Sequence, residues 1–139
     1  AVANLFTSFG FFVDPADANH AWVTYSGFNA KTPDTPGHVF EVRVTMGAGG
    51  PTATFTSLDG HTINGFGDLP ASSIMVSRAG TLYVGTDFGV VQKQKNSPVW
   101  HLAAAGLPNV TVTDLVYVPE RGVLYAATHG QGVWQLKVQ

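Results

Sequence analysis

Short stretches of alternating apolar and polar residues recur along the whole chain, separated by clusters of Gly, Pro, Asn and Asp. The clearest stretch is residues 38–45 (HVFEVRVT), where a period of two places successive side chains on opposite faces of a strand. The pattern predicts eleven strands and almost no helix. The predicted strands are residues 6–13, 20–26, 38–45, 52–57, 73–77, 81–86, 89–93, 99–102, 110–118, 123–128 and 132–138.

Apolar residues, above all Phe, dominate the first predicted strand. Residues 6–13 (FTSFGFFV) are expected to be buried on both faces. Pro15, which lacks a backbone donor, should end the ladder soon afterwards. Residues 27–37 contain two Pro and two Gly and predict an irregular loop, and loops of this length often carry function.

One motif occurs twice. Residues 82–91 (LYVGTDFGVV) return 42 positions later as residues 124–134 (LYAATHGQGVW). A period near 40 built from strands is typical of propeller blades. The sequence therefore predicts an all-β, partial β-propeller with about three four-stranded antiparallel blades, the last of them incomplete. The chain is expected to form one segment over residues 1–139, with blades at about 5–63, 72–104 and 110–138.

Three blades do not close a ring, since propellers usually need about four to eight. The first and last blades would each expose an apolar face and an unpaired edge. We therefore expect the chain either to belong to a longer propeller polypeptide or to self-associate. An eleven-stranded sandwich of two packed sheets is the alternative architecture.

The amino-acid composition limits the classes of partner and ligand that we expect the chain to bind. Only 12% of the residues are charged and the net charge is −2, which predicts no nucleic-acid binding. No apolar run is long enough for a membrane helix. The chain has no Cys, and its five His show no metal-ligand spacing, so no metal and no cofactor are expected. We expect a secreted or periplasmic location, with any signal peptide removed.

Several segments together resemble the sialidase-like propellers that carry BNR or Asp-box repeats, above all the carboxy-terminal blades of secreted bacterial members. The resemblance rests on residues 13–15, 22–29, 35–40, 67–70, 82–90, 106–110 and 126–134. In the Asp-box of this family an Asp binds the backbone and a Trp packs between sheets. Residues 57–63 (SLDGHTI) keep the Ser, Asp and Thr of the box, and in the second unit only Trp100 remains.

The resemblance raises the question of glycoside hydrolysis. Sialidases hold a substrate carboxylate with three Arg, but nothing in the sequence groups Arg43, Arg78 and Arg121 around one pocket, and the Arg-Ile-Pro signature is absent. Hydrolysis in general needs two carboxylates beside the scissile bond. The candidates are Asp68, Asp87 and Asp114, since Asp14 and Glu120 occupy turns where acidic residues are ordinary.

One end of the predicted sheets collects the candidate ligand-binding residues. Successive strands of a meander run antiparallel, so the loops between second and third strands share an end with the links between blades. Exposed aromatic rings beside amides and carboxylates suit sugars, although Phe28 and Phe88 could instead pack beneath their own loops. His129 is the only His expected at this end, as a turn residue. The candidate residues are Phe28, Asn29, Lys31, Asp34, Asp68, Asp87, Phe88, Asn109, His129 and Gln131.

The sequence thus predicts a non-catalytic binding or scaffold module that contacts extracellular carbohydrate. Two alternatives stay open. The chain could be a segment of a sialidase-like or xyloglucanase-like glycoside hydrolase whose catalytic groups lie partly on other blades, or a structural module that forms a ring by self-association.

Overall fold

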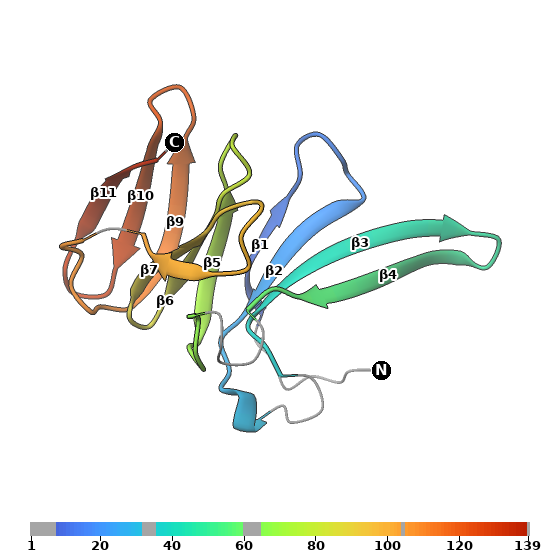
Figure 1. Ribbon diagram of the computed structural model, residues 1–139, viewed down its shortest axis with the longest axis horizontal. Helices are drawn as coiled ribbons and strands as arrows, with labels where there is room; N and C mark the ends of the chain where they lie inside the picture. The colour runs from blue at the N-terminus through green and yellow to red at the C-terminus, as the bar shows by residue number, and fades with distance from the viewer. Residues whose placement is uncertain (1–7, 32–35, 60–64, 104, 139) are drawn as a thin grey trace.

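The structure is a computed structural model, and it describes residues 8–31, 36–59, 65–103 and 105–138. The described strands form three sheets (Figure 1). The first sheet contains β1 (Ser8–Val13), β2 (His20–Tyr25), β3 (Val39–Gly47) and β4 (Gly50–Ser57). The second contains β5 (Ala71–Val76), β6 (Leu82–Thr86), β7 (Gly89–Lys93) and β8 (Trp100–Leu102). The third contains β9 (Val112–Val118), β10 (Val123–Thr128) and β11 (Val133–Lys137).

Each sheet is an antiparallel meander, because strands adjacent in sequence are also hydrogen-bonded neighbours. The prediction of an all-β chain with three antiparallel sheets, the last of three strands, is confirmed. The alternative prediction of a two-sheeted sandwich is wrong, since the described strands divide among three sheets. The helical content of the described residues is one 3-10 turn, η1 (Asn29–Lys31). None of the described helices is long and apolar enough to span a membrane.

The first strands of the three sheets lie side by side in the order β1, β5, β9 (Figure 1). Glycines permit close approaches between the sheets. A Cβ atom on Gly10 of β1 would lie 2.7 Å from the Ser73 Cα, and one on Gly85 would lie 2.8 Å from Val112 Cγ1. Real Cβ atoms do not approach other atoms so closely, so any larger residue at either position would push the sheets apart.

The second sheet is buried on both faces. In β6, Leu82 and Val84 pack toward the first sheet, where they meet Trp22 and Val39. Tyr83, between them, packs toward the third sheet with Leu124. The two-residue period of a strand therefore sends alternate side chains into two separate cores.

The first sheet is covered on one face only. Paired residues on neighbouring strands share a face, and two such rows on the outer face consist mainly of apolar residues. The rows are Val13, Ala21, Val42 and Phe55, and Phe11, Val23, Phe40 and Ser57. Phe11 is 73% exposed and Phe55 is 55% exposed. The expectation that the first strand is buried on both faces is therefore wrong, because the side chains of Phe11 and Val13 on this face are largely exposed.

Candidate functional site

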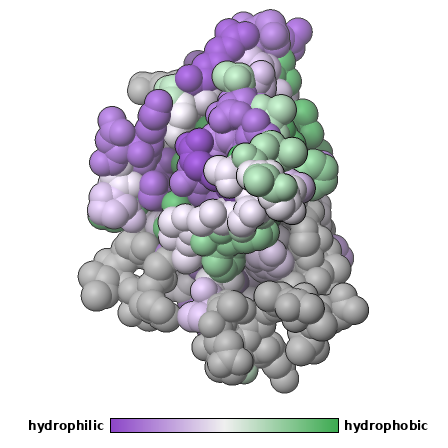
Figure 2. All heavy atoms as spheres, turned by 90° about the vertical axis from the view of Figure 1, so that its right-hand side faces the viewer, coloured by the Kyte–Doolittle hydropathy of each residue, from purple (hydrophilic) through white to green (hydrophobic). Residues whose placement is uncertain are grey.

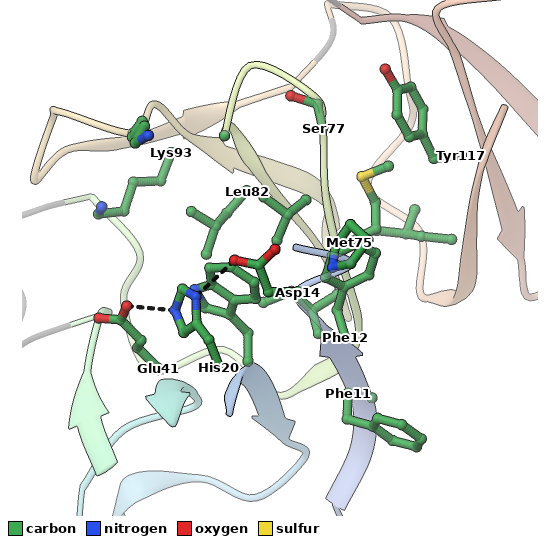
Figure 3. A pocket seen from close by; sticks show the side chains of 18 of the residues that line it. Phe11, Phe12, Asp14, His20, Glu41, Met75, Ser77, Leu82, Lys93 and Tyr117 are labelled. Carbon is green, nitrogen blue, oxygen red and sulfur yellow. Dashed lines mark hydrogen bonds and ion pairs between the residues drawn. The ribbon is translucent and has the colours of Figure 1, made fainter. Parts of the chain in front are cut away.

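A cleft of about 1300 Å³ opens between the first and second sheets and reaches the start of the third (Figure 3). The turn after β1 and the β2 and β3 strands form one wall, which carries Asp14, His20 and Glu41. The other wall carries Lys93 and Lys95. Apolar side chains lie between the walls, among them Phe12, Ile74 and Leu82.

His20 lies between two carboxylates on the first wall. Its Nδ1 is 2.9 Å from Asp14 Oδ2 and its Nε2 is 2.7 Å from Glu41 Oε1 (Figure 3). The imidazole is buried and contacts the Trp22 ring, with 4.1 Å between the ring centroids. Because an ionised carboxylate only accepts hydrogen bonds, both contacts are hydrogen bonds only when the ring carries its second proton.

Arg43 extends this group toward solvent. Its guanidinium donates to Glu41 Oε1 at 3.1 Å and lies 3.9 Å from Asp17 Oδ2. The pKa of the Asp14 carboxyl lies below its ordinary value of 3.8, because the Ala16 N–H and then His20 donate to the ionised form. The wall thus presents the carboxylates of Asp14 and Glu41 in fixed positions, and the lowered pKa keeps Asp14 ionised.

The lowered pKa of Asp14 predicts a pH-dependent stability. A carboxyl whose folded pKa is depressed contributes stability above its unfolded pKa, and this contribution disappears as the pH falls through the folded value. The stability gap between the wild type and Asp14→Asn should therefore be full at neutral pH and shrink below about pH 4. Urea unfolding at several pH values measures it. A gap that does not change with pH contradicts the assignment.

The second wall is basic, and its two lysines have no ion-pair partner among the described residues. Salt bridges near the cleft join Arg43 to Glu41 and Asp17, and Arg78 to Glu120. Hydrogen-bond acceptors on one wall thus face donors on the other across open space. The carboxylates are already engaged by His20 and Arg43, and the described residues include no group of three or more side chains that could hold a metal ion.

A second series of polar residues in close contact lies at the opposite end of the sheets, where the sequence predicts the ligand site. Asp59 is buried and accepts hydrogen bonds from the backbone N–H groups of His38 and Val39, at 2.7 and 3.1 Å, and from His38 Nδ1 at 2.9 Å. His38 Nε2 is buried without a hydrogen bond, 3.1 Å from Asp68 Oδ1 but outside hydrogen-bond geometry. Asp68 Oδ1 also accepts the Asn29 N–H at 2.8 Å.

The environment of Asp59 acts on its pKa in two directions. Burial raises the pKa, but the hydrogen bonds from the His38 side chain and from the backbone of Val39 and His38 outweigh burial and lower it. Asp59 is therefore an ionised, buried anchor between the start of β3 and the end of β4. Because Asp59 is buried away from solvent, its role is to stabilise the fold rather than to contact a ligand.

The structure brings some of the predicted ligand residues together. Asn29 and Asp68 are in direct contact, Asp87 is hydrogen-bonded to Pro70 through its backbone N–H, and the His129 N–H binds the Thr111 carbonyl.

Phe28 and Phe88 are half-exposed rather than packed beneath their loops. Asn109 and Gln131 are exposed. Asp34 and the Lys31 side chain lie outside the described residues.

The three catalytic candidates do not share one site. Asp114 lines the cleft, whereas Asp68 and Asp87 do not. Arg43 and Arg78 line the cleft and Arg121 does not, so the structure does not assemble three arginines there.

Sequence reasoning missed His20, Glu41 and His38. His20 and Glu41 are 21 residues apart and meet because β2 and β3 pair with His20 opposite Arg43. The period of two does place His20 on the face of Trp22 and Glu41 on the face of Arg43, but only the register shows that these faces coincide. Sequence reasoning misses His38 because it expects His129 as the only histidine at the end of the sheets that carries Asp68.

Comparison with known proteins finds distant likeness among solved structures. No protein-family model matches the sequence, and no curated protein matches it. Among solved structures, the chain is similar to part of PorZ, described as an essential bacterial surface component of the type-IX secretion system of the human oral-microbiomic Porphyromonas gingivalis. The identity is 15%, the TM-score is 0.48, and the similarity covers 94% of this chain. It covers 26% of the PorZ chain, so this chain spans about a quarter of the length of that protein.

Proposed function

We propose that the chain is a three-blade segment of a β-propeller that serves as a non-catalytic binding or scaffold module and contacts carbohydrate outside the cytoplasm. The observation that carries this proposal is the contrast between two sheets. The second sheet is covered on both faces by its neighbours, while the first sheet has an outer face of the same apolar character on which Phe11, Val13 and Phe55 are 73%, 47% and 55% exposed. Such faces mark interaction sites in soluble proteins.

The third sheet has a mixed outer face. Its rows pair Val116 with Tyr125 and Gln135, and Asp114 with Ala127 and Val133. Val116 and Val133 are more than half exposed. A further blade, supplied by the same polypeptide or by another copy, would cover the outer face of the first sheet and would meet a more polar surface on the third.

Two local features support the resemblance to Asp-box propellers. Asp59 accepts hydrogen bonds from backbone N–H groups, as the Asp of the box does in that family. Trp100 lies in the core between the first and second sheets, and its indole N–H donates to the Leu58 carbonyl at 2.9 Å. Carbohydrate is the proposed ligand because Phe28 offers a half-exposed ring and its neighbour in sequence, Asn29, fixes the Asp68 carboxylate through its N–H.

The proposal is tested by thiol labelling of β4, which exposes neighbouring residues on opposite faces. Phe55 lies on the outer face of the first sheet, and Thr54 lies on the other face opposite Arg43. Phe55→Cys and Thr54→Cys are introduced singly into the full natural polypeptide. This chain has no Cys, so it contributes no background. If a further blade covers the outer face, the thiol at position 55 is protected and the thiol at position 54 is not.

A further inference from the structure

The cleft between the first and second sheets has no role in the proposed scaffold, yet it has the features of a ligand site. We propose that this cleft binds a neutral oligosaccharide of several sugar rings, held between the carboxylates of Asp14 and Glu41 and the ammonium groups of Lys93 and Lys95. This site is separate from the end that carries Phe28 and Asp68.

The size of the cleft favours an oligomer over a single sugar. Its volume of about 1300 Å³ exceeds the roughly 300–1,000 Å³ of most small-molecule pockets. The cleft reaches all three sheets, from Glu41 on β3 through Ile74 on β5 to Tyr117 on β9. A chain of rings could therefore lie along it.

The two walls match the hydrogen-bonding capacity of sugar hydroxyls. A hydroxyl both donates and accepts, so it can donate to a carboxylate on one wall while a neighbouring hydroxyl accepts from a lysine on the other. Glu41 is positioned for this, since Oε1 is held by His20 and Arg43 while Oε2 has no partner among the described residues. Such charge-assisted hydrogen bonds are stronger than neutral ones.

The region between the walls is apolar and suits the carbon-bound hydrogens of sugar rings. Phe12, Ile74 and Leu82 line it, and Trp22 lies beneath His20. Aromatic and aliphatic side chains with a few fixed polar groups are the usual composition of a ligand pocket.

Other ligand classes fit the cleft less well. The cleft has no net positive charge to attract polyanions such as nucleic acids, because the Lys and Arg side chains that line it are matched in number by the carboxylates of Asp14, Asp17, Glu41 and Asp114. The carboxylates of Asp14 and Glu41 are already paired with His20 and Arg43, so they do not form a free acidic site for a cation. An extended peptide cannot add a strand between β1 and β5, because a Cβ atom on Gly10 would already lie 2.7 Å from the Ser73 Cα.

The test is calorimetric titration with four neutral hexasaccharides, namely cellohexaose, xylohexaose, maltohexaose and chitohexaose, combined with NMR of the tryptophan indole signals. At least one hexasaccharide should bind and shift the Trp22 signal without shifting that of Trp134. Glu41→Gln should weaken binding about tenfold, and Lys93→Gln by several-fold, because each loses a charge-assisted bond. Lys137→Gln, an exposed lysine of β11 outside the cleft, should leave the dissociation constant unchanged.

Three outcomes overturn the cleft site. One is that no hexasaccharide binds. The second is that binding is unaffected by both Glu41→Gln and Lys93→Gln in variants whose circular dichroism is native. The third is that Phe28→Ala abolishes binding while the cleft variants do not, which moves the ligand to the other end and leaves the proposed function standing. The thiol-labelling result does not depend on any of these outcomes, so the scaffold proposal is judged separately.

Discussion

Replacing Asp59 with Asn should destabilise the protein by about 3–5 kcal/mol, the cost of breaking a buried polar pair by removing one partner. The Asp59 carboxylate accepts three hydrogen bonds from His38 and Val39 and is 1% exposed. An amide at this position turns one acceptor oxygen into an NH₂ donor, which then faces donors that have no water to bind. The free energy of unfolding, measured in urea, gives the effect.

Ser57→Ala is the matched control for this substitution. The Ser57 hydroxyl donates to Asp59 Oδ1 at 3.2 Å from an exposed position. Its loss should cost about 1 kcal/mol or less, since water can replace an exposed hydroxyl. Equal costs for the two substitutions would show that Asp59 does not anchor the junction between β3 and β4.

Replacing Trp100 with Ala should cost a similar amount, about 3–5 kcal/mol. Trp100 is 2% exposed, lies edge-on to Phe66 with ring centroids 4.9 Å apart, and donates to the Leu58 carbonyl. The substitution opens a cavity between the first and second sheets and removes their hydrogen bond. The urea midpoint should fall strongly.

Trp134→Ala is the matched control for Trp100→Ala. Trp134 is only partly buried, and its indole donates locally to the Gln131 carbonyl. This substitution should cost about 1 kcal/mol, as expected for a residue outside the core. If Trp134→Ala cost as much as Trp100→Ala, Trp100 would not be the main link between the two sheets.

The arrangement of strands could be predicted because it depends on local pattern. Alternation and turn residues placed all eleven strands, and the repeat of residues 82–91 at 124–134 divided them into units. Burial of β1 could not be predicted in the same way. Whether Phe11 is buried depends on a neighbouring sheet, and no property of Phe11 itself reports that neighbour.

The candidate sites were predicted only where residues lie close in the chain or at one end of the sheets. Antiparallel order predicts Asn29 and Asp68 at the same end of the sheets, and the Asn29 N–H does bind Asp68. That this end binds a ligand stays a prediction. The group around His20 could not be predicted, because its members meet through the register of β2 and β3 and through the approach of the second sheet. Register follows from packing of the whole sheet rather than from any single residue.

The most direct test of the central proposal, that a further sheet covers the outer face of the first sheet, is the ratio of thiol-labelling rates at positions 55 and 54 in the natural polypeptide. Phe55 and Thr54 are both exposed in the chain described here. The account predicts that Phe55→Cys is labelled much more slowly than Thr54→Cys. Dilution should remove this protection if a second copy provides the cover, and should leave it unchanged if the same polypeptide does. Equal labelling rates at the two positions, at every protein concentration, would contradict the account.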